Sequence, residues 1–149
     1  MKGEGLSGIA DEIHLRECRE DEGQAVLDLW RQAGDVVASP TDSLEEVKAA
    51  INHSAALFLV AESKGQMIGT IIGTFDGWRG EVYRLAVTPE VRRRGAARML
   101  VDAAEKWMGE QGCHRITALV EKDHPWATGF WNAAGYQLHE SMSRYFRDI

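Results

Sequence analysis

Apolar and polar residues alternate with a period of two over residues 13–18, which predicts a first strand. The period then changes to that of an amphipathic helix over residues 21–33. Asp21 is expected to cap this helix and Gly34 to end it, because carboxylates favour the first position and glycine the left-handed end. The apolar face of the helix is formed by Ala25, Val26, Leu29 and Trp30.

A second helix is expected after a loop at residues 34–40. It begins at a cap on Thr41 or Ser43 and continues to about His53. Ser43 and Glu46 have the spacing of a capping box, in which each side chain binds the other residue's backbone N–H. The chain therefore places two helices directly after its first strand.

Three strand patterns follow with short turns between them. Residues 57–62 are strongly apolar, and residues 67–75 and 81–88 are rich in β-branched and aromatic residues. The turns at residues 63–66 and 76–80 contain glycine with polar neighbours, as hairpin connections do. These patterns predict an antiparallel meander.

The second half of the chain returns to helical spacing over residues 94–111, and a strand follows at 113–120. A strand, a helix and a strand in succession predict a parallel pair. A shorter helix over 124–134 and two short strands over 136–147, with a turn near Glu140, complete the pattern. We expect one α/β (α+β) domain at residues 13–149, with a mixed, mostly antiparallel sheet of about seven strands and about four helices. Residues 1–12 are expected to form a loose tail.

Composition narrows the class of protein. The net charge of −6 disfavours binding to nucleic acid or to an anionic membrane, and no segment has the length and apolar content of a membrane span. Two cysteines and no signal-peptide pattern predict a cytoplasmic protein without disulfides. The five histidines show no ligand spacing, so no metal site is expected.

The most informative segment joins the third strand of the meander to the long helix. Arg92, Arg93 and Arg94 precede Gly95, and two alanines follow at the helix entrance. Unpaired N–H groups at a helix N-terminus bind phosphate well, and arginines add charged donors. No Walker motif is present, and no Gly-x-Gly-x-x-Gly motif follows a predicted strand. The segment predicts a pyrophosphate site, and a solvated helix end or a nucleic-acid patch is the alternative.

Two motifs carry a resemblance to a known family. Arg92-x-x-Gly95-x-Ala97 resembles the acetyl-CoA-binding motif of the GNAT superfamily of N-acetyltransferases, and the string from Ala127 through Phe130-Trp131 to Gly135-Tyr136 resembles its second motif. The order of predicted elements after residue 12 is also similar to the GNAT fold. Small uncharacterised bacterial acetyltransferases are the members that it resembles.

This resemblance implies that acetyl-CoA is the co-substrate and that a primary amine of a small molecule or of a peptide or protein N-terminus attacks it directly in a ternary complex. The expected CoA-binding residues lie on the third meander strand, at the helix entrance and in the second motif. They are Leu85, Ala86, Val87, Arg92, Arg93, Arg94, Gly95, Ala96, Ala97, Ala127, Phe130 and Trp131. A backbone N–H at about Val87 is expected to stabilise the oxyanion.

The resemblance assigns catalytic roles less completely. Glu81 lies eleven residues before Arg92, which is where the histone acetyltransferase branch carries its base. The tyrosine that many members use as the acid is replaced by Trp131, which has no proton to give. Either the thiolate leaves without assistance, or Tyr136, Tyr145 or Tyr83 substitutes as the acid. A non-catalytic acyl-CoA-binding or regulatory module is the alternative function.

Three aromatic residues are expected around the acceptor: Trp30, Trp78 and Trp126. Trp78 and Trp126 occupy loop-like positions, where an aromatic ring can cover a cation or lie on the surface without a ligand. The sequence does not identify the acceptor amine. Homodimers are common in the family, but no sequence feature establishes one here.

Overall fold

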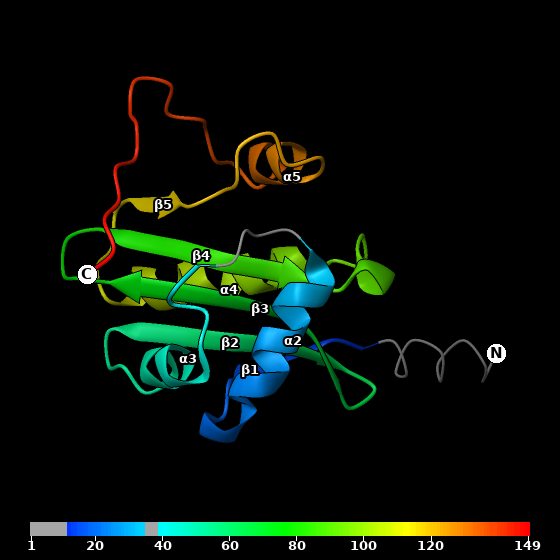
Figure 1. Cartoon of the computed structure of the whole chain (residues 1–149). Coiled ribbons are helices and arrows are strands. Elements are labelled where there is room, and N and C mark those ends of the chain that lie inside the picture. The colour runs from blue at the N-terminus through cyan, green and yellow to red at the C-terminus, as the bar shows by residue number, and fades with distance from the viewer. Residues whose placement is uncertain (1–11, 35–38) are drawn as a thin grey trace.

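The structure is a computed structural model that describes residues 12–34 and 39–149. Its core is one sheet of five strands in the order β1-β2-β3-β4-β5, with α2 and α3 on one face and α4 on the other (Figure 1). The expected loose tail before residue 12 and residues 35–38 of the expected loop lie outside the described residues. The strands are β1 (His14–Glu17), β2 (Ala56–Ser63), β3 (Gln66–Phe75), β4 (Gly80–Val87) and β5 (Ile116–Ala118). The helices are α2 (Gly23–Ala33), α3 (Leu44–Ile51), α4 (Ala96–Glu110) and α5 (Ala127–Ala133), with 3₁₀ turns η1 (Glu20–Glu22) and η2 (Pro89–Val91).

Strand pairing confirms the expected topology. The strands β1 to β4 pair in antiparallel fashion with their neighbours, and β4 pairs in parallel with β5. The connection between this parallel pair is α4, which packs across β3 and β4. The meander and the strand–helix–strand unit are therefore both present.

Each face of the sheet has its own apolar core. On one face, α4 buries Leu100, Val101, Ala104 and Met108 completely. Gly80 at the start of β4 is required there, because a Cβ at this position would overlap the sulfur atoms of Met108 and Cys113. On the other face, the core is formed from α2, α3 and the strands beneath them. It includes Val26, Leu29, Trp30, Val47, Phe58, Val60, Ile72 and Ala86.

The observed starts of several helices differ from the boundaries expected from the sequence. Ser43 caps α3 as expected, and its Oγ accepts the N–H of Glu46 at 3.2 Å. Asp21 does not cap α2, because residues 20–22 form the turn η1 and the helix begins only at Gly23. The helix α4 begins at Ala96 rather than residue 94, since Gly95 at φ 90° lies in the left-handed region. The helix α5 begins at Ala127 rather than residue 124, after a turn with Asp123 at φ 62°.

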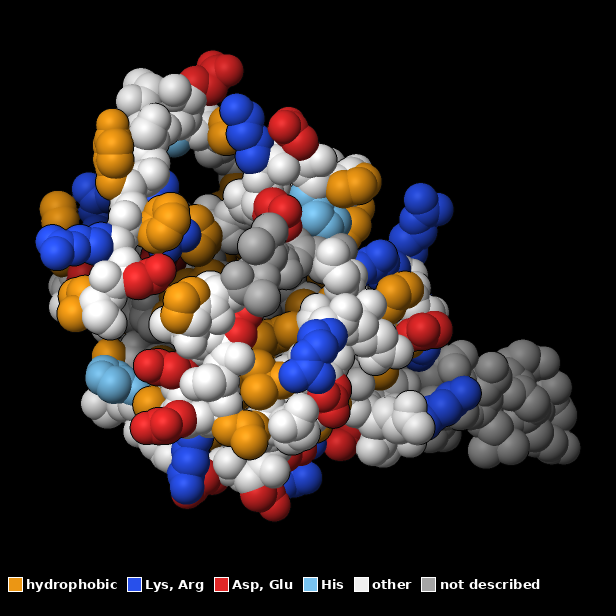
Figure 2. Space-filling view, viewed as in Figure 1, with side chains coloured by type: hydrophobic (Ala, Val, Ile, Leu, Met, Phe, Trp, Pro, Cys, Tyr) orange, Lys and Arg blue, Asp and Glu red, His pale blue; other side chains and the backbone are white. Residues whose placement is uncertain are grey.

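The two strands expected over residues 136–147 are wrong, so the described sheet has five strands rather than about seven. Tyr136 packs against the α4 core, whereas the large apolar side chains from residue 138 to 149 are exposed and lie along the edge of the molecule (Figure 2). An alternating pattern forms a strand only where a partner buries one face, because burial must offset the entropy of ordering. The exposed residues are Leu138, Met142, Tyr145, Phe146 and Ile149.

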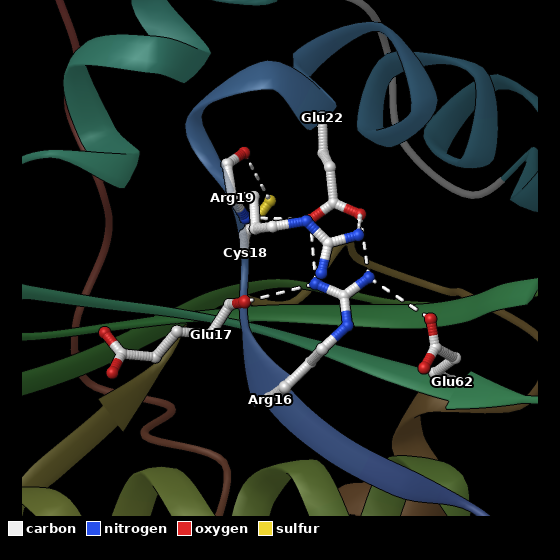
Figure 3. A network of polar contacts seen from close by, with 6 residues as sticks. All are labelled: Arg16, Glu17, Cys18, Arg19, Glu22 and Glu62. Atoms are coloured by element: carbon white, nitrogen blue, oxygen red, sulfur yellow. Dashed lines mark hydrogen bonds and ion pairs between the residues drawn. The ribbon is translucent and has the colours of Figure 1, made fainter. Parts of the chain in front are cut away.

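A charged network joins β1 to the start of α2 (Figure 3). The guanidinium of Arg16 donates two hydrogen bonds to the carboxylate of Glu22, at 2.8 and 2.7 Å, and one to Glu62 at 3.3 Å. Glu22 Oε1 also accepts the backbone N–H of Arg19 at 2.7 Å. The Arg16 hydrogen bonds are the main reason that the pKa of Glu22 falls to about 2. Glu22 therefore fixes the chain's turn from β1 into α2.

The two cysteines of the chain differ in burial. Cys18 and Cys113 are both free thiols, and burial raises the pKa of Cys18 to about 12, so this thiol stays protonated. Within residues 12–34 and 39–149, no helix combines the length and apolar content that a bilayer span requires.

The Glu22 network predicts a pH-dependent effect of Glu22→Gln. Charged hydrogen bonds of this kind stabilise a protein by about 2 kcal/mol, so the variant should lose about that much free energy of unfolding at pH 7. Because the folded pKa of about 2 is below the ordinary value of 4.5, the wild-type advantage should be complete above pH 4.5 and lost as the pH falls through 2. Urea unfolding at several pH values measures this difference.

Glu17→Gln is the matched control, because it removes the same charge from the exposed end of β1. It should change the free energy of unfolding by less than about 0.5 kcal/mol. Equal losses in the two variants would contradict the role given to Glu22.

Candidate active site

The pairing between β4 and β5 ends early. Glu81 is aligned with Thr117 and Val82 with Ala118, and a last hydrogen bond joins Leu119 N to Val82 O at 3.0 Å. Beyond it, the chain leads away from β4 towards α5 (Figure 1). In the described structure, the second half of β4 therefore has a strand neighbour only on the β3 side, and an extended ligand could lie along its other edge.

The turn after β4 is shaped to bind an anion. Arg93 at φ 70° and Gly95 at φ 90° both have left-handed backbones, and Ala96 begins the 15-residue helix α4. No side chain caps this helix, so the amides of its first turn are available to a ligand. The positive end of the helix dipole lies at the same point. Arg93 and Arg94 are exposed beside it, whereas Ala96 is buried.

Arg92 is oriented differently from its two neighbours. Its Nη2 donates to the carbonyl oxygen of Ala33 at the end of α2, at 3.0 Å, and its guanidinium lies 5.7 Å from the ring centre of Trp126. These contacts place Arg92 in the wall of a cavity of about 390 Å³. Trp126 Nε1 is buried in the same wall and has no hydrogen-bond acceptor among the described residues. Lys122 and His124 line it together with Glu121 and Asp123, so the cavity offers hydrogen-bond donors among charges of both signs.

A second, larger cavity lies at the opposite end of β4. It measures about 580 Å³ and is lined by α3, the ends of β2 and β3, and the start of β4. The carboxylates of Glu46, Asp76 and Glu81 line it, and Figure 2 shows acidic side chains gathered over α3. Its one arginine, Arg79, lies 4.3 Å from the ring centre of Trp78. The balance of charge favours a cationic ligand.

Glu81 and Tyr83 lie on one face of β4, two residues apart, and both line this larger cavity. Burial, followed by the negative charge of Glu81, raises the pKa of Tyr83, and a hydrogen bond with Thr74 opposes the shift. Tyr83 therefore stays protonated at neutral pH and can donate a proton. A carboxylate and a phenol at one cavity wall can act as a base and an acid.

The aromatic residues of the second sequence motif form a cluster. Trp126, Phe130, Trp131 and Tyr136 follow one another in edge-to-face contacts, with ring centres 4.8 to 5.9 Å apart. Ala127 and Trp131 are buried against α4. The hydroxyl of Tyr136 donates to Glu105 of α4 at 2.7 Å, and burial followed by this bond raises the pKa of Tyr136. The cluster holds α5 against α4.

Several of the expected catalytic and acceptor residues do not line the acidic cavity. Trp30 is buried in the α2 face of the sheet, and its Nε1 donates to Thr70 Oγ1 at 2.9 Å. Tyr145 is 93% exposed on the C-terminal segment, and Tyr136 lines neither cavity. Trp126 belongs to the smaller cavity rather than to the acidic one. Trp78 is 74% exposed and does not line the acidic cavity. Its ring contacts Arg79, which does line it.

The third-strand residues expected to bind CoA are placed beside the open edge. Ala86 and Val87 are buried, and Leu85 packs into the α4 core. The side chains of Leu85, Ala86 and Val87 therefore pack inside the protein, so only the backbone groups of these residues can contact a ligand.

Sequence reasoning missed most of the acidic cavity wall. Glu46, Ala49 or Ala50 and His53 recur at three- or four-residue spacing, which marks a second face of α3. This helical spacing is the sequence signal that could have identified the α3 part of the cavity wall. The contributions of Thr74, Phe75, Asp76 and Thr117 depend on how strand ends meet, which no local pattern predicts. Among the described residues, no group of three or more His, Cys, Asp or Glu side chains could hold a metal ion.

Comparison with known proteins places this geometry in a family. The model of the acetyltransferase (GNAT) family matches residues 14–136, which include every helix and strand described above. The match covers both cavities and the turn before α4.

Solved structures have the same fold. The PaiA N-acetyltransferase from Thermoplasma acidophilum, in complex with coenzyme A, is 21% identical with a TM-score of 0.76, over 86% of this chain and 91% of that one. The aminoglycoside 6'-N-acetyltransferase AAC(6')-IG from Acinetobacter haemolyticus is 22% identical with a TM-score of 0.75, over 91% and 99%. AAC(6')-Iy in complex with a bisubstrate analogue, CoA-S-monomethyl-acetylneamine, is 16% identical with a TM-score of 0.75, over 93% and 99%. At these identities the likeness establishes the fold.

Proposed function

This chain belongs to the acetyltransferase (GNAT) family, and we propose that it transfers an acetyl group from acetyl-CoA to a primary amine. One observation carries the proposal: β4 joins an anion-binding helix entrance to an acidic cavity, with an open edge between them. The step from Tyr83 to Val87 spans about 13 Å at the rise of a strand. An extended thioester arm fits along such an edge.

Acetyl-CoA would lie with its diphosphate at the entrance of α4. The amides of Gly95, Ala96 and Ala97 would donate to the phosphate oxygens, and Arg93 and Arg94 would add charge. The smaller cavity beside Arg92 and Trp126 offers donors to the polar groups of the same molecule. The pantetheine arm would then follow β4, pairing with backbone groups as an added strand would. The known relative in complex with coenzyme A supports this choice of co-substrate.

The amine acceptor would enter through the acidic cavity. Its ammonium form is attracted by the carboxylates of Glu46, Asp76 and Glu81. Relatives whose names give aminoglycosides as substrates support a cationic amine here. A small-molecule amine and a peptide N-terminus both fit an opening of about 580 Å³.

Transfer to an ammonium acceptor removes two protons from its nitrogen, one before attack and one as the amide forms; one proton reaches the departing sulfur, and the other is released to solvent. Glu81 would take the first, directly or through water, so that the neutral amine attacks the acetyl carbonyl. The new C–N bond forms as the C–S bond breaks. Tyr83, which stays protonated beside Glu81, would give its proton to the CoA thiolate. This assigns the acid role to Tyr83 instead of Tyr136, whose hydroxyl donates to Glu105.

Gly95→Val tests the diphosphate site. A β-branched residue strongly disfavours φ 90°, so the variant should move the first-turn amides of α4 away from the phosphates. Affinity for CoA should fall by at least about tenfold, equivalent to about 1.4 kcal/mol. Isothermal titration calorimetry with CoA measures this change.

Gly65→Val is the matched control, because Gly65 also has a positive φ and open space around its Cβ position but lies in the β2–β3 turn. It should strain the backbone similarly and leave CoA affinity within about twofold. The proposed diphosphate site is wrong if Gly95→Val binds CoA as tightly as the control does.

Glu81→Gln tests the proposed base. The amide has nearly the same shape but cannot take a proton, so kcat should fall by about 100-fold while KM for acetyl-CoA changes little. Tyr83→Phe should also lower kcat, by a smaller factor, since a thiolate leaves without full protonation. Release of free thiol from acetyl-CoA, measured with a panel of amines, gives both constants.

Glu46→Gln provides the comparison at the same cavity wall. It removes a charge that would attract the acceptor without touching the reacting atoms, so it should raise KM for the amine more than it lowers kcat. Wild-type binding of CoA without any turnover, together with indifference to Glu81→Gln, would favour a binding or regulatory module instead.

A further inference from the structure

The strand β4 contains a bulge beside its open edge. Thr70 of β3 is opposite Ala86 and Ile72 is opposite Tyr83, so β4 holds one extra residue between these pairs. Arg84, within the bulge, has φ 55°, a left-handed backbone that residues with side chains rarely adopt. Surrounding contacts must hold such a conformation.

Two buried side chains hold the backbone of the bulge. Thr70 Oγ1 donates to the carbonyl oxygen of Arg84 at 2.9 Å, and it accepts the indole N–H of Trp30, also at 2.9 Å. Thr70 is 0% exposed and Trp30 8% exposed. The hydroxyl has a single proton, and the Trp30 bond leaves that proton for Arg84 O. We call Trp30, Thr70 and the Arg84 carbonyl the bulge clamp.

The side chain of Arg84 is fixed as well. Its guanidinium lies 4.5 Å from the ring centre of Trp30 and donates to Asp42, just before α3. The side chains of Arg84 and Asp42 are 13% and 17% exposed. Arg84 is therefore held at its backbone by Thr70 of β3 and at its charged end by Trp30 of α2 and Asp42.

The orientation of the Arg84 carbonyl decides that of the next amide. A trans peptide group is planar, with its C=O and N–H directed to opposite sides. Because the clamp turns Arg84 O towards Thr70 on β3, the N–H of Leu85 is directed away from β3, towards the open edge of β4. This edge is where the thioester would lie.

We propose that Thr70, supported by Trp30, is a positioning residue that aims the Leu85 amide at the carbonyl oxygen of the bound thioester. The inference rests on the proposed acetyl transfer and assigns residues that never touch the substrate. A backbone N–H aimed at the developing oxyanion stabilises the transition state more than the ground state. Loss of the clamp should therefore lower kcat while leaving binding of acetyl-CoA almost unchanged.

Thr70→Val removes the hydroxyl and keeps the shape, and Thr70→Ser keeps the hydroxyl. The expected result is a kcat for Thr70→Val about tenfold below wild type, with KM for acetyl-CoA within about twofold and with the pH profile unmoved. Thr70→Ser should retain at least about half of the wild-type kcat. Melting temperatures of the variants establish that each is folded.

Infrared spectra of bound acetyl-CoA labelled with ¹³C at the acetyl carbonyl supply a second readout. In the wild type the carbonyl band should move to lower frequency on binding, because a hydrogen bond polarises the C=O. Thr70→Val should lose most of that shift and Thr70→Ser should keep it. Where Thr70→Val does not fold, Trp30→Phe is measured in the same way, since it removes the indole N–H and keeps a ring beneath Arg84.

Equal kcat values and equal carbonyl shifts for Thr70→Val, Thr70→Ser and wild type would overturn the proposal while acetyl transfer itself stands. A lower kcat with an unchanged carbonyl shift would also overturn it, because the loss would then be structural. If the wild-type protein neither binds acetyl-CoA nor acetylates any amine, that result would instead contradict the proposed function on which the inference rests.

Discussion

Strand pairing between β4 and β5 stops after Val82, and the chemistry assigned to this protein depends on that break. A backbone N–H or C=O that loses its strand partner is costly unless water or a ligand replaces it. The break persists because the chain after β5 is held elsewhere: α5 packs on α4 through Trp131, and Tyr136 donates to Glu105. The hydrophobic cores on the two faces of the sheet then keep the open edge in a fixed position.

Charge is divided between the two ends of β4. The helix entrance after β4 carries arginines and uncapped amides, whereas the cavity at the start of β4 is lined by three carboxylates and one arginine. A polyanionic co-substrate and a cationic acceptor are thereby attracted to opposite ends of one strand. In the proposed complex, their reactive groups would meet along the edge between them, beside Glu81 and Tyr83. Trp30 of α2 and Asp42, which lies just before the α3 helix of the acidic cavity wall, also hold the Arg84 bulge.

Local sequence patterns predicted most of the fold because each depends on neighbouring residues. Alternation predicted β1, runs of apolar, β-branched and aromatic residues predicted β2 to β4, and Ser43 predicted the start of α3. The pattern at the C-terminus failed, because alternation specifies a face but cannot supply a partner strand. Trp30 was assigned to the acceptor, yet its indole N–H is bonded in the core to Thr70, a partner forty residues away. The wall of the acidic cavity is built from several strand and helix ends. The residue spacing along α3 is therefore its one signal in the sequence.

A crystal structure of the complex with acetyl-CoA tests the central claim most directly. The diphosphate oxygens should lie within hydrogen-bond distance of the amides of Gly95 and Ala96, and the thioester should lie along β4 beyond Val82, with its carbonyl facing the Leu85 N–H. Clear density for acetyl-CoA at any other surface, or an unliganded helix entrance at saturating acetyl-CoA, would contradict it.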